Sequence, residues 1–415
     1  MTKNTNLTPI CNCSVNSKRD IRSILFLIFL FPTFWGYMSI GKGQILYLFA
    51  TFLIICILIF YRQYKIRFPI IGLSLFTILS LCYFFTLSIN SFLPQSSVSF
   101  KDFSDVARPI FYLFFFSLPY IIGFSVSDTK YLIKTYLIIV TGILVFDIIK
   151  FIPIFYPILR LYTLFEVESL NYSRFAGTFC FCYNFGFASL LGLAFCLYSK
   201  FKFKYLTIII YVLLFVLIGS RSVMIACVAL LLGYYFWAPG FFRKIIAIPI
   251  VVISCVLLYN ILINIDIPII TDSINYAERL VDALSGTAQD GSLNTRSSQL
   301  SRVLNLFDRN PLIGNGPIKD DDIQIEIQLG YYLSAWGLLG TFVFLSIIAV
   351  FFYWANSASS SHNPIISNFS KANRLWIIAS FFVGMSTPIT DQMRVFQIFY
   401  MMQGVQYILY RNRNS

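Results

Sequence analysis

The sequence predicts an all-α polytopic membrane protein with about 12 transmembrane helices. Of the 415 residues, 58% are hydrophobic and only 12% are charged. The apolar residues come in blocks of roughly 17–25, the length at which an α-helix crosses a bilayer. A water-soluble domain of this length would not bury so much apolar surface, and the strands of a membrane barrel would show short alternating segments instead.

Hydropathy divides the chain into two bundles that flank one long hydrophilic loop. The twelve expected spans are residues 23–40, 44–61, 68–89, 109–127, 131–149, 176–199, 205–219, 222–238, 245–264, 328–354, 374–388 and 394–410. The first nine form a bundle over 23–264, and the last three form a bundle over 328–410. Between them lies the large loop 265–327, which is expected to carry short surface helices. The ends, 1–22 and 411–415, are expected to be polar cytoplasmic tails.

The distribution of lysine and arginine predicts the orientation. If both termini are cytoplasmic, the inner segments hold 18 of the 31 basic residues and, of the 18 acidic residues, only Asp20 and Asp128. One of these inner segments is the Ser/Asn-rich loop 355–373, which is expected to be a linker. The excess of positive charge therefore marks the cytoplasmic side of the membrane, and no nucleic-acid partner is expected. The nine cysteines show no paired spacing with a histidine nearby, so no metal site is expected.

The opposite, outer face gathers arginines at the ends of the expected spans. They are Arg108, Arg174, Arg221, Arg296, Arg302 and Arg394. A guanidinium group has a planar fork of donors that suits phosphate oxygens. The alternative for each one is an ordinary position at a helix end, where the side chain reaches lipid headgroups or pairs with an acid. Arg221 differs from the rest because it lies in a one-turn break between two apolar spans, where a charge has little room to leave the bundle.

The segment 294–340 joins a polar helix directly to an apolar span. A helix is expected over 295–308, with Leu300, Val303, Leu304 and Phe307 on one apolar face. Such a helix is expected to lie along the bilayer surface over a cavity, or to be no more than a lid.

Glu326 is the strongest candidate for a catalytic carboxylate, because it lies where the loop becomes a span. A partly buried carboxylate has a raised pKa and can act as a general base for a sugar hydroxyl. The acids at 320–322 are rivals, although three adjacent acids more often form a solvated turn, and they also suit a divalent cation.

Two further features complete the candidate chemistry. Asp391 and Arg394 are expected to pair in an outer loop. The single histidine, His362, falls in an inner loop, so no Ser-His-Asp machinery is expected on the outer face.

The arrangement resembles bacterial O-antigen polymerases (Wzy-type) and their relatives, the O-antigen ligases. A ligase-like R-x-x-x-L pattern occurs at 296–300 and is followed by the turn 310–316, and a G-S-R break occurs at 219–221. An R-x-x-G-x-F pattern with a following asparagine occurs at Arg174, Gly177, Phe179 and Asn184. Where the ligases carry a histidine at the start of the late span, counting back from Gly337 leads to Glu326. This departure favours a polymerase over a ligase.

The resemblance implies glycan polymerisation at the outer face of the bacterial inner membrane. A growing glycan on undecaprenyl pyrophosphate would move onto a lipid-linked repeat unit, and a chain-length regulator protein is a compatible partner. The energy is stored in the glycosyl pyrophosphate, so no cofactor is expected, and no P-loop sequence occurs. The implied roles are pyrophosphate binding for Arg221 and Arg296, and proton acceptance for Glu326. The supporting substrate-binding positions are Arg108, Arg174, Asn184, Arg302, Asp322 and Arg394.

Two other functions remain open from the sequence. One is an O-antigen-ligase-like enzyme that moves finished glycan from the carrier lipid to another acceptor. The other is a flippase or secondary transporter, which should carry ionisable residues near the middle of the membrane and show two comparable halves.

Overall fold

The computed structural model describes most of the two predicted bundles and part of the loop between them. The described residues are 14–32, 40–92, 98–149, 154, 157, 176–179, 181–200, 204–237, 291–317, 325–392 and 394–414. Within them the chain forms helices and no strand, so the predicted all-α class is confirmed for this part of the chain. Each predicted span among these residues overlaps an α-helix, whereas the span 245–264 and most of the loop 265–327 lie outside the described residues.

The helices follow the order of the predicted spans. The first group is α1 (Ser14–Leu30), α2 (Ile40–Tyr61), α3 (Ile70–Ser91), α4 (Arg108–Ile121) and α5 (Thr129–Ile149). The second group is α7 (Cys182–Tyr198), α8 (Lys204–Leu217), α9 (Arg221–Phe236), α12 (Gly291–Arg309), α13 (Gln328–Ala358), α14 (Pro364–Val383) and α15 (Val395–Arg411). Short 3-10 helices occur at Phe100–Ala107 (η2), Val126–Asp128 (η3) and Ile389–Asp391 (η6). In the described part, the helices long and apolar enough to cross a membrane are Ile70–Ser91, Val126–Phe146 and Gln328–Ala358.

Two helices begin earlier than the hydropathy predicts. α1 starts at Ser14, inside the segment expected to be a tail, and α14 starts at Pro364, inside the expected linker 355–373. At α14 the reason is local, because the Asn363 side chain accepts a hydrogen bond of 3.0 Å from the backbone N–H of Ile365 and Pro364 occupies the first turn. Hydropathy misses such polar first turns because it measures apolar content rather than capping.

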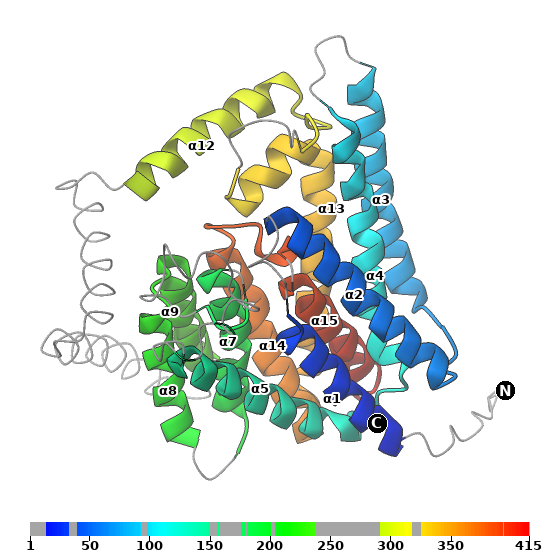
Figure 1. Cartoon of the computed structure of the whole chain (residues 1–415), viewed down its shortest axis with the longest axis vertical. Coiled ribbons are helices and arrows are strands. Elements are labelled where there is room, and N and C mark those ends of the chain that lie inside the picture. Colours follow the sequence, from blue (N-terminus) through cyan, green and yellow to red (C-terminus); the bar gives the residue numbers. More distant parts are fainter. Residues whose placement is uncertain are drawn as a thin grey trace, which may run out of the picture.

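One end of the bundle gathers segments that the charge distribution assigns to the same side. Asp20 of α1 accepts a hydrogen bond of 2.5 Å from the Tyr64 hydroxyl and lies 3.5 Å from Arg62. The Ser17 hydroxyl donates to Asp128 at 3.0 Å. The start of α1, the end of α2 and the start of α5 therefore meet, as the ribbon also shows (Figure 1).

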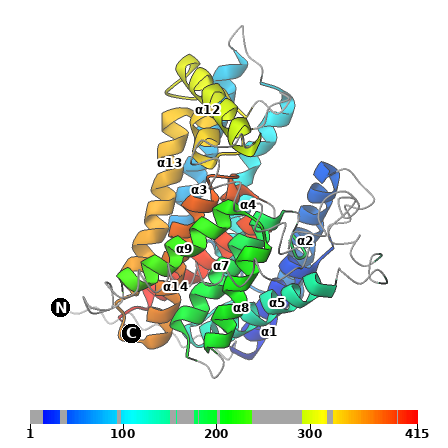
Figure 2. The ribbon, with the colours of Figure 1, turned by 90° about the vertical axis from the view of Figure 1, so that its left-hand side faces the viewer.

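Helices α14 and α15 lie in the middle of the bundle, with the other helices around them (Figure 1; Figure 2). A reciprocal pair of amide hydrogen bonds, 3.0 and 3.1 Å, joins Asn373 of α14 to Gln403 of α15. α4 can approach α15 closely because position 404 of α15 is a glycine. A Cβ atom there would clash with the carbonyl oxygen of Phe116 in α4. Small residues and satisfied amides are the features by which helices associate where water is absent.

Helix α13 is broken at Gly337, whose backbone has φ 61° and ψ −165°. The turn 310–316 occupies the break and supplies the backbone groups that the helix lacks. Four backbone hydrogen bonds of 2.8–3.0 Å join the two segments: Asn315 N to Ser334 O, Gly316 N to Ala335 O, Leu338 N to Pro311 O, and Leu339 N to Leu312 O. Broken helices occur at membrane depth only where other parts of the protein satisfy the freed backbone groups, as this turn does.

Helix α3 holds the same turn from the other side. Thr86 donates to the carbonyl oxygen of Ile313 at 2.8 Å, and the Asn90 side chain donates to that of Gly314 at 2.9 Å. Because the turn directly follows α12, these bonds fix the end of α12 to both α3 and α13.

We expect Gly337→Ala to destabilise the protein strongly. An alanine would have to adopt positive φ, at a cost of about 1–3 kcal/mol, and its Cβ would clash with the backbone of Leu312 and Gly314. Gly142→Ala in α5 is the matched control, because no atom lies within 4 Å of a Cβ built there. Thermal unfolding of both variants in detergent measures the difference, and equal midpoints would contradict this account of the break.

Candidate functional site

Helix α12 lies across one end of the bundle, over the start of α13 (Figure 2). Gln299 and Val303 of α12 are buried, and Gly330 of α13 permits the approach, since its Cβ would lie 3.0 Å from the Val303 side chain. The predicted apolar face does not pack as a whole against the bundle, because Leu300 and Leu304 are 51% and 54% exposed, as a helix lying along a bilayer surface would have them. The helix packs through the stripe that contains Gln299, which leaves these two leucines on its outer surface.

The start of α13 and the segment after α14 meet beneath α12. Arg296 donates from Nη2 to the Ser386 hydroxyl at 3.2 Å, and the backbone N–H of Glu326 donates to the Gln299 side chain at 3.2 Å. Arg296 and Gln299 are one helical turn apart, so Glu326 and Arg296 lie in the same neighbourhood. The Glu326 side chain is exposed, rather than partly buried as its position predicted.

Two polar groups in this neighbourhood retain bonding capacity. The Nε atom of Arg296 is buried and has no hydrogen-bond partner among the described residues. Gln328 is buried, its Nε2 donates to the Thr390 hydroxyl at 2.9 Å, and its Oε1 has no partner in the same part of the chain. Buried polar atoms of this kind are costly unless a ligand or water completes their bonds.

Arg221 begins α9 directly after Gly219, which has φ 63°. Its side chain is buried, as the sequence predicted for a charge in a one-turn break. Val223, two residues on, packs against Gly186 near the start of α7. The positive end of a helix and an arginine side chain together form an environment that favours anions.

Asn184 lies one turn from that contact, in the first turn of α7. It is buried, and its Oδ1 has no hydrogen-bond partner among the described residues. α7 runs antiparallel to α14, because Phe187 stacks on Trp376 at 4.7 Å while Phe195 meets Phe369 at 5.4 Å. The starts of α7 and α9 are therefore at the end of the bundle where α14 finishes.

The structure thus brings several candidates to one end of the molecule. Gly384, just after α14, accepts a hydrogen bond of 2.8 Å from the Gln328 backbone, which ties this end to the start of α13. Arg221, Asn184, Arg296 and Glu326 share this end, and Arg302 is half-buried on α12. Arg174 and the acids at 320–322, including Asp322, lie outside the described residues.

Arg394 makes structural contacts with α1 and α2, and its predicted role in substrate binding stays a prediction. Its guanidinium donates to the carbonyl oxygens of Phe29 at 2.8 Å and Phe31 at 2.5 Å, and it lies 4.7 Å from the centre of the Tyr47 ring. The predicted pair with Asp391 is wrong, because Arg394 is committed to the carbonyl groups at the end of α1. A basic side chain is favourable at the C-terminal end of a helix because the last carbonyl groups have no partner within the helix and carry partial negative charge.

Asp391 instead accepts hydrogen bonds from two tyrosines, Tyr112 at 2.8 Å and Tyr332 at 3.0 Å. Beside them Arg108 pairs with the buried Asp105 at 2.9 Å, and the Tyr331 hydroxyl donates to Asp105 at 3.2 Å.

Burial raises the pKa of Asp391, although the nearby Arg108 and the hydrogen bonds from Tyr112 and Tyr332 act in the opposite direction. The sequence patterns did not predict this tyrosine–aspartate cluster. The one available signal was the adjacent pair Tyr331–Tyr332 just inside a span, since tyrosine hydroxyl groups at such positions need partners.

The fold and the site define an all-helical membrane protein with cationic and polar side chains gathered at one end of its bundle. A family model described as O-Antigen ligase matches residues 206–345, a segment that contains α9, α12 and the break in α13. No curated protein matches the chain. The family match confirms the resemblance to the O-antigen polymerase and ligase superfamily, whose members process glycans at membranes.

We expect Arg394→Ala to lower the stability of the folded protein. Each hydrogen bond from a charged group to a buried partner contributes roughly 1.5–3 kcal/mol, and the variant loses both bonds to α1. Arg394→Lys, which keeps the charge but not the fork of donors, should recover part of the loss. Unfolding midpoints in detergent test this, and an unchanged midpoint in Arg394→Ala would return Arg394 to the substrate-binding candidates.

We expect Asp391 to make stability depend on pH. Because its pKa is raised in the folded state, the folded protein holds this proton more tightly than the unfolded chain does. The resulting stabilisation is fully present below the ordinary pKa of aspartate, roughly 4, and is lost as the pH rises through the raised value. Unfolding midpoints between about pH 4 and pH 7 should fall more steeply for the wild type than for Asp391→Asn. Identical slopes would contradict the assignment.

Proposed function

We propose that this protein is a surface-polysaccharide polymerase of the O-antigen type. In this proposal a growing glycan is transferred from undecaprenyl pyrophosphate onto a lipid-linked repeat unit at the periplasmic face of the inner membrane. The observation that carries the proposal is that Arg296 and Gln299, one turn apart on α12, bond Ser386 and the Glu326 backbone respectively, at the same end of the bundle as Arg221.

The reaction breaks one bond and forms another. A hydroxyl oxygen of the acceptor sugar forms a bond to the anomeric carbon at the reducing end of the growing glycan. The bond from that carbon to the diphosphate oxygen breaks, and undecaprenyl pyrophosphate leaves with the electron pair. The hydroxyl proton passes to a base, for which Glu326 is the candidate, since its carboxylate is exposed to an incoming acceptor.

The arginines are proposed to stabilise the departing diphosphate. Negative charge grows on the departing diphosphate, and donors aimed at that charge stabilise the transition state more than the ground state. Arg296 has a buried Nε that is free to bond, and Arg221 is aligned with the positive end of α9. Arg302 and, outside the described residues, Arg174 are the supporting candidates.

A ligase is the second candidate, because the matching family is described as O-Antigen ligase. The carboxylate of Glu326, at the place where the ligase pattern has a histidine, favours polymerisation. The glycan of a deletion strain separates the two functions. Loss of a polymerase leaves a single repeat unit attached to its acceptor, whereas loss of a ligase leaves long chains unattached.

We expect Arg221→Ala, Arg296→Ala and Glu326→Gln each to leave cells with single-repeat glycan. Loss of one donor to a developing charge lowers a rate by roughly 10²–10³-fold, and loss of a general base by roughly 10²–10⁴-fold. Arg309→Ala is the matched control, because Arg309 lies exposed in the last turn of the same helix as Arg296. Glycan length on gels, compared at equal membrane content of each variant, measures the effect. Long chains in all three site variants would reject the assignment.

A further inference from the structure

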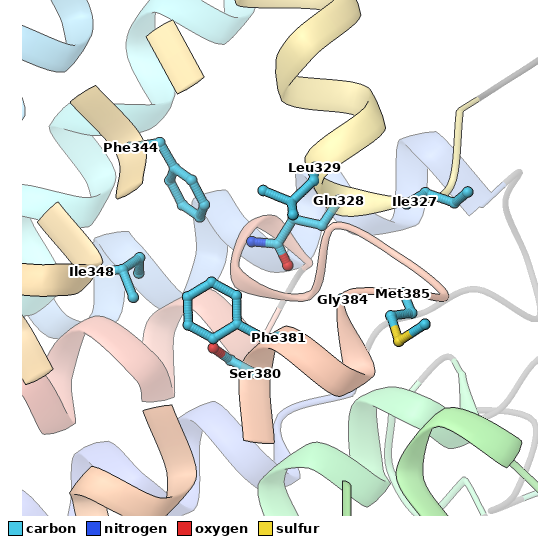
Figure 3. A pocket seen from close by; sticks show the side chains of 9 residues that line it. All are labelled: Ile327, Gln328, Leu329, Phe344, Ile348, Ser380, Phe381, Gly384 and Met385. Atoms are coloured by element: carbon cyan, nitrogen blue, oxygen red, sulfur yellow. The ribbon is translucent and has the colours of Figure 1, made fainter. Parts of the chain in front are cut away.

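A cavity between α13 and α14 lies close to the candidate site and is lined by Gln328, Phe344 and Phe381, among others (Figure 3). Its volume is about 50 Å³, and a water molecule occupies roughly 30 Å³ in the liquid. The cavity therefore has room for about one water molecule and for no organic ligand. A charged surface at the opposite end of the bundle is the stronger candidate for binding a ligand.

Exposed basic side chains gather where the start of α1, the end of α2 and the start of α5 meet. We call them the basic patch, and its members are Arg19, Arg22, Lys65, Arg67, Lys130 and Lys134. The patch lies at the opposite end of the bundle from the candidate site. α1 runs from the patch to the carbonyl groups that Arg394 binds, and α4 runs from the contact between Tyr112 and Asp391 towards η3 beside the patch.

The acids of these three segments are buried and bonded inside the protein. Asp20 is 1% exposed and is held by Tyr64 and Arg62, while Asp128 is 0% exposed and accepts a hydrogen bond from Ser17. These bonds join the segments, so the backbones that carry the basic patch hold fixed places relative to one another. Among the described residues of the three segments no acid is exposed, and the exposed charge there is therefore all positive.

The cations of the basic patch occur in three pairs, one on each segment. The two on α1 and the two on α5 are one helical turn apart, and the two after α2 are two positions apart in a stretch without regular structure. Like charges one helical turn apart repel each other, and a bound anion relieves this repulsion. Three such pairs, held together by the buried acids, form a surface that favours several anionic groups at once.

Exposed apolar side chains are interleaved with the basic patch. Ile66 and Phe68 alternate with the two cations after α2 and are 53% and 42% exposed. The guanidinium group of Arg22 lies 5.8 Å from the centre of the Phe26 ring, which is itself exposed. Basic groups beside apolar and aromatic side chains are typical of the level at which lipid headgroups meet hydrocarbon. The anions that fit this surface therefore belong to lipids rather than to a soluble molecule.

We propose that the basic patch binds the phosphate groups of anionic phospholipids, such as phosphatidylglycerol, in the leaflet at this end of the bundle. The acyl chains of the same lipids would lie beside Phe26, Ile66 and Phe68. The distribution of lysine and arginine predicts this side to be cytoplasmic, and the cytoplasmic leaflet of a membrane attracts basic segments through its anionic lipids. The inference is independent of the proposed function, because none of the six cations belongs to the candidate site.

Titrations of the purified full-length protein in a neutral detergent test the ligand. Phosphatidylglycerol, phosphatidylcholine and inorganic phosphate are added separately, and the shift of the unfolding midpoint gives each affinity. We expect phosphatidylglycerol to bind more tightly than phosphatidylcholine by a factor of roughly 10 or more, and salt to reduce this factor by screening the exposed charges. Equal affinities for the two lipids would overturn the proposal. Inorganic phosphate that binds as tightly as phosphatidylglycerol would assign the patch to a soluble anion and would also overturn it.

Two double variants test the place of binding, Arg19→Gln with Arg22→Gln and Lys65→Gln with Arg67→Gln. A basic residue near an anionic membrane surface changes the affinity roughly 5-fold, so each double variant should bind phosphatidylglycerol roughly 25-fold more weakly. All four side chains are exposed, and either variant decides the outcome if the other does not fold. Wild-type affinity in a folded double variant would contradict the assignment.

The matched control is Lys200→Gln with Arg309→Gln, which removes the same charge at exposed positions outside the basic patch. We expect its affinity for phosphatidylglycerol to equal that of the wild type. An equal weakening in the control would show that only net charge matters, and the site would be rejected. An acidic protein is the competing partner for such a surface. Polyglutamate that binds the wild type more tightly than phosphatidylglycerol does, at equal concentration of anionic groups, would identify a protein-docking surface instead.

Discussion

The break in α13 is the constraint on which the rest of the site depends. A helix interrupted at Gly337 exposes backbone donors and acceptors, and the turn 310–316 satisfies them. Because this turn is the direct continuation of α12, satisfying the break also fixes α12 over the start of α13. The position of Arg296 relative to Glu326 therefore depends on these backbone hydrogen bonds at the turn. The turn lies about 20 Å from Arg296 along α12, at a rise of roughly 1.5 Å per residue. A rigid frame of this kind is what a site that aligns two large substrates requires.

The arginines at this end of the molecule divide by the partners they already have. Arg394 is held by two hydrogen bonds to the carbonyl groups at the end of α1, and Arg108 pairs with the buried Asp105. Arg296 makes one hydrogen bond to the neutral hydroxyl of Ser386, and its buried Nε has no hydrogen-bond partner among the described residues.

The buried polar groups in the middle of the bundle bear on the transporter alternative. Asn373, Gln403 and Gln406 are amides that form hydrogen bonds to one another or to Ser370. The neighbouring Arg374 of α14 is the buried ionisable group among them, and it donates to Asn356 at 2.7 Å. Ion-coupled transporters place ionisable residues near the membrane midplane. The paired amides of α14 and α15 in the described part of the chain resemble a structural core, and the candidate site residues Arg296 and Glu326 lie at one end of the bundle. This arrangement suits an enzyme whose substrates are both anchored in the membrane.

The amino-acid sequence by itself determined the helical class, the order of the spans and the burial of Arg221, because hydrophobic period and segment length depend only on neighbours along the chain. The short patterns around 219–221 and 296–316 also pointed to the O-antigen polymerase and ligase superfamily, and the family match over residues 206–345 is consistent with that resemblance. Only the tertiary structure decided which face of α12 packs, that Glu326 is exposed, that Arg394 binds α1 and that Asp391 belongs to two tyrosines. These outcomes depend on which partner side chains and carbonyl groups come within hydrogen-bonding distance from segments hundreds of residues apart, and no local pattern encodes that distance.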